Sequence, residues 1–207
     1  GATHAGISVG EDGATHQCNE DIALMRTIPG MVILNPSDDI EAKAAVKAAY
    51  EHEGPVYMRF GRLAVPIIND RPDYKFEIGK GVTLREGKDV AIIATGLCVS
   101  ESLAAAEKLA ADGIDAKVIN IHTIKPLDED LVVAAAKECG KVVTVEEHSV
   151  IGGLGSAVCE TLSRKAPTPV KTIGVQDCFG ESGPAVALLE KYGLNAEGIY
   201  ASVKEFV

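Results

Sequence analysis

The alternation of strand-like and helix-like segments constrains the fold of this chain more than any other feature. An apolar run at residues 31–36 precedes a stretch at 39–52 whose alanines and isoleucine recur at helical spacing, and which stops at a Gly-Pro pair. A second apolar run follows at 55–60. A helix between two strands acts as a crossover connection, which favours parallel pairing of those strands. Residues 31–60 are therefore predicted to form one β-α-β unit.

The same alternation resumes in the second part of the chain. Between the two series, residues 61–73 are rich in proline and charged residues, as is typical of a linker. We predict an α/β protein of two consecutive units, residues 1–70 and 71–207, of which the second is a complete domain with a mostly parallel sheet. The later strands are predicted at 89–95, 116–121, 141–146 and 170–175, and the later helices at 100–112, 128–139, 155–165 and, as one or two short pieces, 185–207.

The first unit is small for a parallel sheet. A parallel sheet needs cover on both faces, and one β-α-β unit cannot provide it. We expect further strands to precede this unit in the natural polypeptide or to come from a partner chain. The chain starts at Gly1 and not at Met, as a fragment or a trimmed terminus would.

Composition excludes several classes of protein. The net charge of −10 disfavours nucleic-acid binding, which depends on neutralising phosphates. No apolar run approaches the roughly 18 residues of a membrane span, and no signal peptide opens the chain. The five cysteines are widely spaced without a CxxC pair, which favours reduced thiols of a cytoplasmic protein over disulfides or a metal site.

The densest group of polar side chains is GEDGATHQ, residues 10–17. It holds two carboxylates, a hydroxyl, an imidazole and an amide, and its glycines allow the backbone to approach a ligand closely. His4 lies a short loop upstream, so two imidazoles could face one cleft. The run therefore indicates a binding site, and the alternative is a polar turn that caps a helix starting near Asn19.

Longer motifs carry a resemblance to a known family. HAGISVGEDGATHQCNEDIALMRTIPGMVILNPSD, residues 4–38, resembles the stretch of transketolases that closes the pyrimidine-binding domain. By this resemblance residues 1–70 are the end of that domain, residues 71–207 are the transketolase C-terminal domain, and the chain is the C-terminal section of a split transketolase. Further matches are RFGR (59–62), IKPLDED (124–130), EEHSVIGGLGSAV (146–158) and FGESGPAVALLEKYGL (179–194).

The resemblance implies four site residues. His4 matches a histidine that contacts the phosphate end of the sugar, and Asp12 matches an aspartate that hydrogen-bonds a sugar hydroxyl. His16 matches a histidine near the reacting carbons and is the catalytic candidate. Arg62 matches an arginine that binds the substrate phosphate, and a guanidinium suits that role because it pairs with phosphate bidentately. The alternatives are a solvated surface charge at Arg62 and a phosphate role for Arg59, which should point in a different direction along the strand.

The resemblance also implies cofactors, substrates and partners. The family transfers a two-carbon ketol unit between phosphorylated sugars of the pentose phosphate pathway, using thiamine diphosphate and Mg2+ in a dimeric assembly. The family's groups that hold this cofactor precede the matched stretch or lie in another domain. The chain also lacks tryptophan. We therefore expect this chain alone to bind no cofactor or metal and to be inactive until an N-terminal transketolase section, or the remaining polypeptide, completes a homo- or hetero-oligomer.

Three other functions remain as alternatives. Deoxyxylulose-phosphate synthases usually carry an HHG element after the histidine of this loop, whereas here Gln17 and Cys18 follow His16. The β subunits of 2-oxo acid dehydrogenases usually lack the GEDG element. A non-catalytic dimerisation or interaction module would use the same C-terminal domain without chemistry.

The other polar residues are expected to have structural roles, each with an alternative. GGLGS at 152–156 precedes a helix and could cradle a phosphate, although the acidic residue expected about 20 positions later is missing. Cys18 is interpreted as a buried residue at a helix start, with a reactive thiol as the alternative. For Glu146, Glu147 and His148 the alternative is a cleft at a strand end. His52 and His122 are expected at ordinary surface or loop positions.

Overall fold

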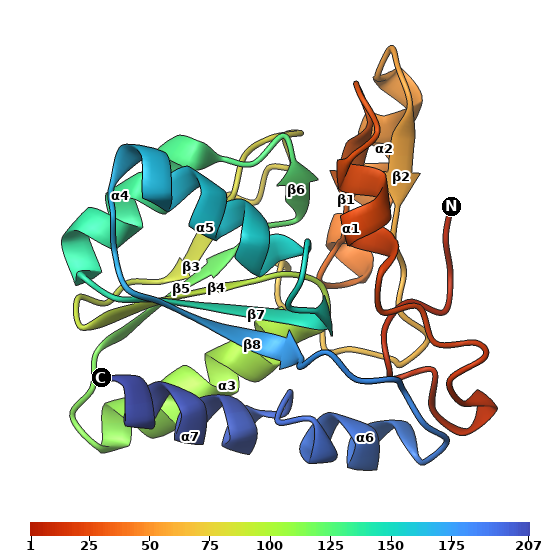
Figure 1. The fold of residues 1–207 in the computed structure, drawn as a ribbon. Coiled ribbons are helices and arrows are strands. Elements are labelled where there is room, and N and C mark those ends of the chain that lie inside the picture. Colours follow the sequence, from red (N-terminus) through yellow and green to blue (C-terminus); the bar gives the residue numbers. More distant parts are fainter.

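The computed structural model describes residues 1–207 and contains two sheets (Figure 1). The larger sheet has the order β3-β5-β4-β7-β8, and only β3 runs antiparallel to its neighbour. This confirms the predicted α/β fold with a mostly parallel sheet. Its strands are β3 (Val82–Arg85), β5 (Ala116–Asn120), β4 (Val90–Ala94), β7 (Val142–Ser149) and β8 (Val170–Val175).

Helices cover both faces of this sheet, as Figure 1 shows. The strand period of two divides the core between the faces. On the central strand β4, Ile92 joins the buried cluster formed with α3 and α7, whereas Ile93 joins the cluster formed with α4 and α5. The covering helices are α3 (Cys98–Ala111), α7 (Ala196–Phe206), α4 (Glu129–Cys139) and α5 (Leu154–Lys165).

The smaller sheet has the order β2-β1-β6. The β-α-β unit predicted from the sequence supplies two of its strands, which pair in parallel. The third strand, β6, comes from the second part of the chain and pairs antiparallel to β1, so the two parts share a sheet. The elements of this layer are α1 (Asp21–Arg26), β1 (Val32–Leu34), α2 (Asp39–Glu51), β2 (Val56–Met58) and β6 (Thr123–Lys125).

Two strands were not predicted from the sequence, β3 and β6. Each has only three or four residues, too few to show a period of two, and a proline follows β6 directly. The apolar periodicity that identified the other strands is therefore missing from both.

The segment between β2 and β3 has no helix or strand, yet it is fastened to the first unit. The Asp38 carboxylate caps α2 and also accepts hydrogen bonds from the backbone N–H groups of Ile68 and Asn69, both at 2.8 Å. The Tyr74 hydroxyl donates to the buried carboxylate of Glu41. These bonds hold the predicted linker along the start of α2.

His122 is not a surface residue, so that expectation was wrong. It lies directly after β5, is completely buried, and stacks on Phe76 with ring centroids 4.3 Å apart. Burial lowers the pKa of His122, which keeps the ring neutral. The sequence did not indicate this because Phe76 lies in the segment without regular structure.

Two negative findings complete the description of the fold. None of the helices combines the length and the apolar character that crossing a bilayer requires. All five cysteines are free.

Candidate functional site

The GEDGATHQ run, residues 10–17, is the tip of a loop whose stem is buried; residues 11, 12 and 14–16 of the tip are exposed, whereas Gly10, Gly13 and Gln17 are buried. In the stem, Ile7 packs into the core of the larger sheet and Val9 is also buried. The tip begins with a short 3-10 turn, η1 (Gly10–Asp12), which packs beside α6 (Ala185–Lys191). The loop thus belongs in sequence to the first unit but rests on the second.

Two close contacts hold the stem on β7. The Glu147 carboxylate accepts a hydrogen bond of 2.6 Å from the backbone N–H of Ser8. Gly6 has a φ of +74°, and a Cβ there would lie 2.2 Å from the Glu147 carboxyl carbon. Only glycine satisfies both the backbone angle and this approach.

The tip brings together two of the four predicted site residues. Arg62 donates through Nη1 to the Asp12 carboxylate at 2.6 Å and to the Val9 carbonyl at 2.7 Å. The side chains of Arg62 and Asp12 are 47% and 42% exposed, so both are open to a ligand from solvent. Residues 50 positions apart in the sequence therefore form one charged pair.

The two predicted histidines are exposed but less organised. Nδ1 of His4 lies 2.9 Å from the Thr3 hydroxyl, and Nδ1 of His16 lies 3.0 Å from the Thr15 hydroxyl. In each case the only polar partner is the preceding threonine, and Nε2 makes no hydrogen bond to the protein. The structure therefore leaves Nε2 of both rings available to a ligand.

Arg59, the alternative phosphate ligand, is buried, and two of its three guanidinium nitrogens have partners. Its Nε donates to the Asp21 carboxylate at 2.8 Å, and its Nη2 donates to the carbonyls of Cys18 and Glu147. Tyr57 donates to the same Asp21 oxygen. Burial alone would raise the pKa of Asp21, but the Arg59 guanidinium holds that pKa below its usual value. Arg62 is therefore the more exposed of the two guanidinium groups.

The start of α5 is occupied by a carboxylate of the protein itself. Glu146 accepts hydrogen bonds from the backbone N–H groups of Leu154 and Gly155 at 2.7 and 2.8 Å. Burial raises the pKa of Glu146 to about 7. An anion at this helix start is therefore supplied internally, and the phosphate cradle suggested for residues 152–156 is wrong.

His148 has a structural position between the two units. Its Nδ1 lies 2.7 Å from the Ser149 carbonyl, and its Nε2 accepts from the backbone N–H of Ile22 at 3.2 Å, at the start of α1. Burial and the nearby Arg59 guanidinium lower the pKa of His148. A neutral ring with its proton on Nδ1 satisfies both contacts, which supports the structural interpretation of His148.

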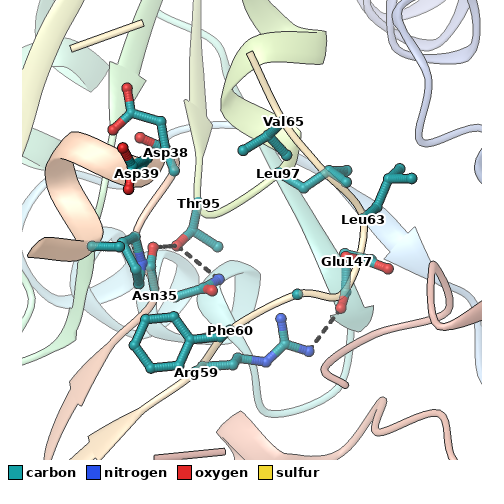
Figure 2. A pocket seen from close by; sticks show the side chains of 14 residues that line it. Asn35, Asp38, Asp39, Arg59, Phe60, Leu63, Val65, Thr95, Leu97 and Glu147 are labelled. Atoms are coloured by element: carbon teal, nitrogen blue, oxygen red, sulfur yellow. Dashed lines mark hydrogen bonds between the residues drawn. The ribbon is translucent and has the colours of Figure 1, made fainter. Parts of the chain in front are cut away.

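A small cavity of about 130 Å³ lies where the two units meet, and Glu147 is among its lining residues, as the cleft alternative for residues 146–148 suggested. It lies by the carboxyl ends of β1 and β4, the edge at which α/β proteins bind ligands. Figure 2 shows two hydrogen bonds in its lining, one between Asn35 and Thr95 and one between Arg59 and Glu147. Asn35 and Thr95, the polar residues directly after β1 and β4, were the further signal in the sequence.

The metal-ligating and aromatic side chains are dispersed. No group of three or more His, Cys, Asp or Glu side chains is placed to hold a metal. Among the phenylalanines, Phe76 is stacked on His122, Phe179 is 95% exposed and Phe60 lines the cavity. Burial raises the pKa of the Cys18 thiol, which is only half-buried and lies three residues before α1, so neither a buried position nor a reactive thiolate describes it.

Comparison with known proteins follows the same two-part division. Residues 1–67 match the family described as the transketolase pyrimidine binding domain, and residues 79–199 match the transketolase C-terminal domain. The chain is 48% identical over 206 residues to a putative transketolase C-terminal section of Methanocaldococcus jannaschii, covering 99% of this chain and 64% of that protein. It is 47% identical over 200 residues to a 6-deoxy-6-sulfo-D-fructose transketolase subunit of a Clostridium species, covering 97% and 62%.

A solved structure supports the same relationship. The structure described as a split gene transketolase, inactive beta4 tetramer, superposes with a TM-score of 0.90 at 51% identity, covering 99% of this chain and 65% of that one. This chain therefore spans less than two thirds of each of these three relatives.

Proposed function

This chain belongs to the transketolase family, and from that premise we propose that it is the C-terminal section of a ketol transferase. The enzyme transfers a two-carbon ketol unit between sugars that carry an anionic end group. This chain contributes substrate-binding residues and assembly surface, and polypeptide outside these 207 residues completes the site. The division into residues 1–70 and 71–207 corresponds to the substrate-bearing part and the C-terminal domain.

The observation that carries the proposal is the exposed pair of Arg62 and Asp12. Arg62 uses only Nη1 on the protein, so Nε and Nη2 are free to donate to an oxyanion. Asp12 keeps one carboxylate oxygen free to accept from a sugar hydroxyl. A cation and a carboxylate side by side suit a ketose that ends in an anionic group and carries hydroxyls along its chain.

The names of relatives support this class of substrate. One relative is a 6-deoxy-6-sulfo-D-fructose transketolase subunit. Another, an apulose-4-phosphate transketolase subunit from Phocaeicola vulgatus, is 43% identical over 202 residues. A sulfonate and a phosphate are both tetrahedral oxyanions that a guanidinium binds in the same way. We assign Arg62, with His4, to that end of the sugar.

His16 is assigned to the reacting end of the sugar. Its exposed imidazole has Nε2 free and can hold or move a proton at a ketose hydroxyl near neutral pH. Thiamine diphosphate with Mg2+ supplies the carbanion chemistry in the complete enzyme, and the groups that bind it lie outside this chain. The fragment alone is therefore inactive.

The proposed partner is an N-terminal transketolase section, with which this polypeptide forms an oligomer. The structure described as a split gene transketolase, inactive beta4 tetramer, supports this arrangement, because that description joins assembly of four beta chains to a lack of activity. We extend both properties, self-assembly and dependence on a partner, to this chain.

The test is reconstitution of the complete enzyme. The full natural polypeptide is mixed with its N-terminal partner, thiamine diphosphate and Mg2+, and ketol transfer is measured with xylulose 5-phosphate, a 6-sulfonated ketose and an unphosphorylated ketose as donors. Transfer from the anionic ketoses, with lower KM than from the neutral one, supports the proposal. The absence of transfer from any ketose overturns it.

One alternative rests on a specific similarity and is separated by the same assay. The chain is 40% identical over 211 residues to a 1-deoxy-D-xylulose-5-phosphate synthase of Geobacter sulfurreducens, covering 33% of that protein. A synthase of this kind would give pyruvate-dependent carboligation instead of ketol transfer. That outcome would assign the chain to the second function.

A further inference from the structure

We propose that Gln17 is a positioning residue through which the C-terminal unit sets the conformation of the substrate loop. The inference rests on the proposed function, because it concerns the loop that carries Asp12 and His16. It assigns a part in substrate recognition to the C-terminal unit, which supplies none of the four proposed ligand side chains.

Gln17 joins the two units through its side-chain amide. It is only 8% exposed, in contrast to the exposed side chains of its neighbours on the tip. Its Nε2 donates to the Ile7 carbonyl at 3.0 Å and to the Glu181 carbonyl at 2.8 Å. Both acceptors are backbone carbonyls, so this position requires a side chain with two N–H donors.

The acceptor on the C-terminal unit has polar contacts of its own. The Glu181 carboxylate pairs with Lys191 at 2.6 Å. The Tyr192 hydroxyl lies 3.2 Å from that carboxylate and 3.1 Å from the Phe179 carbonyl, and its single proton is shared between these two acceptors. These contacts connect the segment around residue 181 to the end of α6, and Gln17 joins the loop to that segment.

A second contact lies at the other side of the tip. Gly13 has a φ of +75°, and a Cβ there would lie 2.2 Å from the Ser182 hydroxyl oxygen. Asp12 directly precedes this contact and His16 directly precedes Gln17. Both candidate ligands are thus adjacent to points where the tip touches residues 181–182.

These contacts explain how a polar loop can hold a defined geometry. The side chains of the tip have almost no apolar partners, so packing does not restrict them. Loss of the Gln17 bridge would let the tip move, and misplacement of binding groups by about 1 Å can cost roughly 100-fold in rate. The effect should exceed what the loss of stability alone explains, because Gln17 also bonds to the segment that touches the tip.

The test is Gln17→Met in the assembled enzyme, which removes both donors and keeps the length of the side chain. The matched control is Gln176→Met, because Gln176 also donates to two carbonyls, those of Thr172 and Gly174, but entirely within the C-terminal unit. Tyr192→Phe is a milder variant that loosens the Glu181 segment without touching the loop. It also serves if Gln17→Met does not fold.

Two readouts are compared with the control. The first is kcat/KM for ketol transfer, expected to fall roughly 10- to 100-fold for Gln17→Met, less for Tyr192→Phe and not at all for Gln176→Met. The second is hydrogen exchange of the His16 and Gln17 backbone amides in the full chain, which bond to the Gly13 carbonyl and should exchange faster in Gln17→Met. The melting temperature is measured to separate these effects from unfolding.

The outcomes separate this inference from the proposed function. If the wild-type enzyme is active and Gln17→Met matches Gln176→Met in both kcat/KM and amide exchange, the inference is wrong. If the wild-type enzyme shows no ketol transfer, the proposed function fails, and the exchange data still decide whether Gln17 orders the loop.

Discussion

The two arginines of the RFGR motif lie three residues apart and have opposite environments. Arg59 is 2% exposed and donates to Asp21 and to two backbone carbonyls, which lie on the loop before α1 and on β7. The Arg62 side chain is 47% exposed and pairs with Asp12 on the tip of the substrate loop. The Arg59 guanidinium thus connects the two units, whereas the Arg62 guanidinium is accessible to a ligand.

The difference shows that burial, and not the presence of an ion pair, decides what such a pair contributes. Removing one partner of a buried pair leaves the other charge in a site without water, which is costly. An exposed pair is screened by solvent and contributes little to folding. A charged residue that contributes little to the free energy of unfolding can take part in ligand binding without loss of stability. The following predictions test this contrast.

Arg59→Met should be the most damaging substitution. It leaves the Asp21 carboxylate, whose side chain is 5% exposed, without its cation, and it removes donors from two carbonyls. We expect the free energy of unfolding to fall by about 3–5 kcal/mol, the usual range for breaking a buried pair from one side. Urea denaturation measures this change.

The double variant Arg59→Met with Asp21→Asn is the control for that interpretation. It removes the stranded charge, so it should recover part of the stability lost in Arg59→Met alone. The two single variants each lose some free energy of unfolding, and these two losses can be added. If the double variant loses more than this sum, the pair is not the source of the loss.

Arg62→Ala should leave folding intact and impair recognition of the anionic end of the sugar. In the assembled enzyme we expect KM for a phosphorylated ketose to rise about 10- to 100-fold, since a hydrogen bond to a charged group contributes roughly 1.5–3 kcal/mol. KM for the unphosphorylated ketose should change far less. Equal changes for both donors would contradict the phosphate role of Arg62.

Arg164→Ala provides a matched control for Arg62→Ala. Arg164 is 62% exposed and pairs with Glu129 on the far helices of the C-terminal unit. We expect the free energy of unfolding to change by less than about 0.5 kcal/mol. KM for the phosphorylated ketose should stay the same.

His148 should make the buried region sensitive to acid. Its pKa is lowered by burial and by Arg59, so the folded state resists protonation, and stability present above about pH 6.5 is lost as the pH falls toward the folded pKa. Compared with His148→Gln, which does not titrate, the wild type should lose stability as the pH falls from 7 to 5. Denaturation curves at several pH values measure this difference.

The neighbouring Glu146 affects the pH dependence in the opposite direction. Its raised pKa of about 7 means that the folded state binds the proton more tightly, so stability rises as the pH falls from about 7 to 4.5. Glu146 lies 3.7 Å from Nδ1 of His148, so the comparison with His148→Gln measures the two groups as a coupled pair, and Glu146→Gln in both backgrounds separates them. A wild type and variant whose difference does not change with pH would show that His148 does not titrate in this range.

The sequence predicted the elements that have strong periodicity and missed those defined by distant partners. The helices and longer strands of the C-terminal unit were located, because their apolar residues recur at regular spacing. The short strands β3 and β6 and the buried His122 were missed, since each depends on a neighbour far along the chain.

The candidate site shows the same limit. The polar run at residues 10–17 predicted a binding site, and most of its polar side chains are exposed. The sequence could not show that Asp12 would pair with Arg62, 50 residues away, or that Gln17 would contact Glu181, 164 residues away. Periodicity reports local geometry, whereas the first pair depends on the folding of the first unit and the second on how the two units pack.

Asp12→Asn should have the smallest effect on folding and so sharpen the contrast with Arg59. The Asp12–Arg62 pair is about half exposed, and such pairs are typically worth about 0–1 kcal/mol, so the free energy of unfolding should change by less than about 0.5 kcal/mol. Denaturation in low and high salt should give the same small difference, because screening already weakens the pair.

In the assembled enzyme, Asp12→Asn replaces a charged acceptor of the sugar hydroxyl's hydrogen bond by a neutral amide. We therefore expect kcat/KM for the phosphorylated ketose to fall several-fold. A loss of stability as large as that of Arg59→Met would show that the pair holds the loop together and is not reserved for substrate.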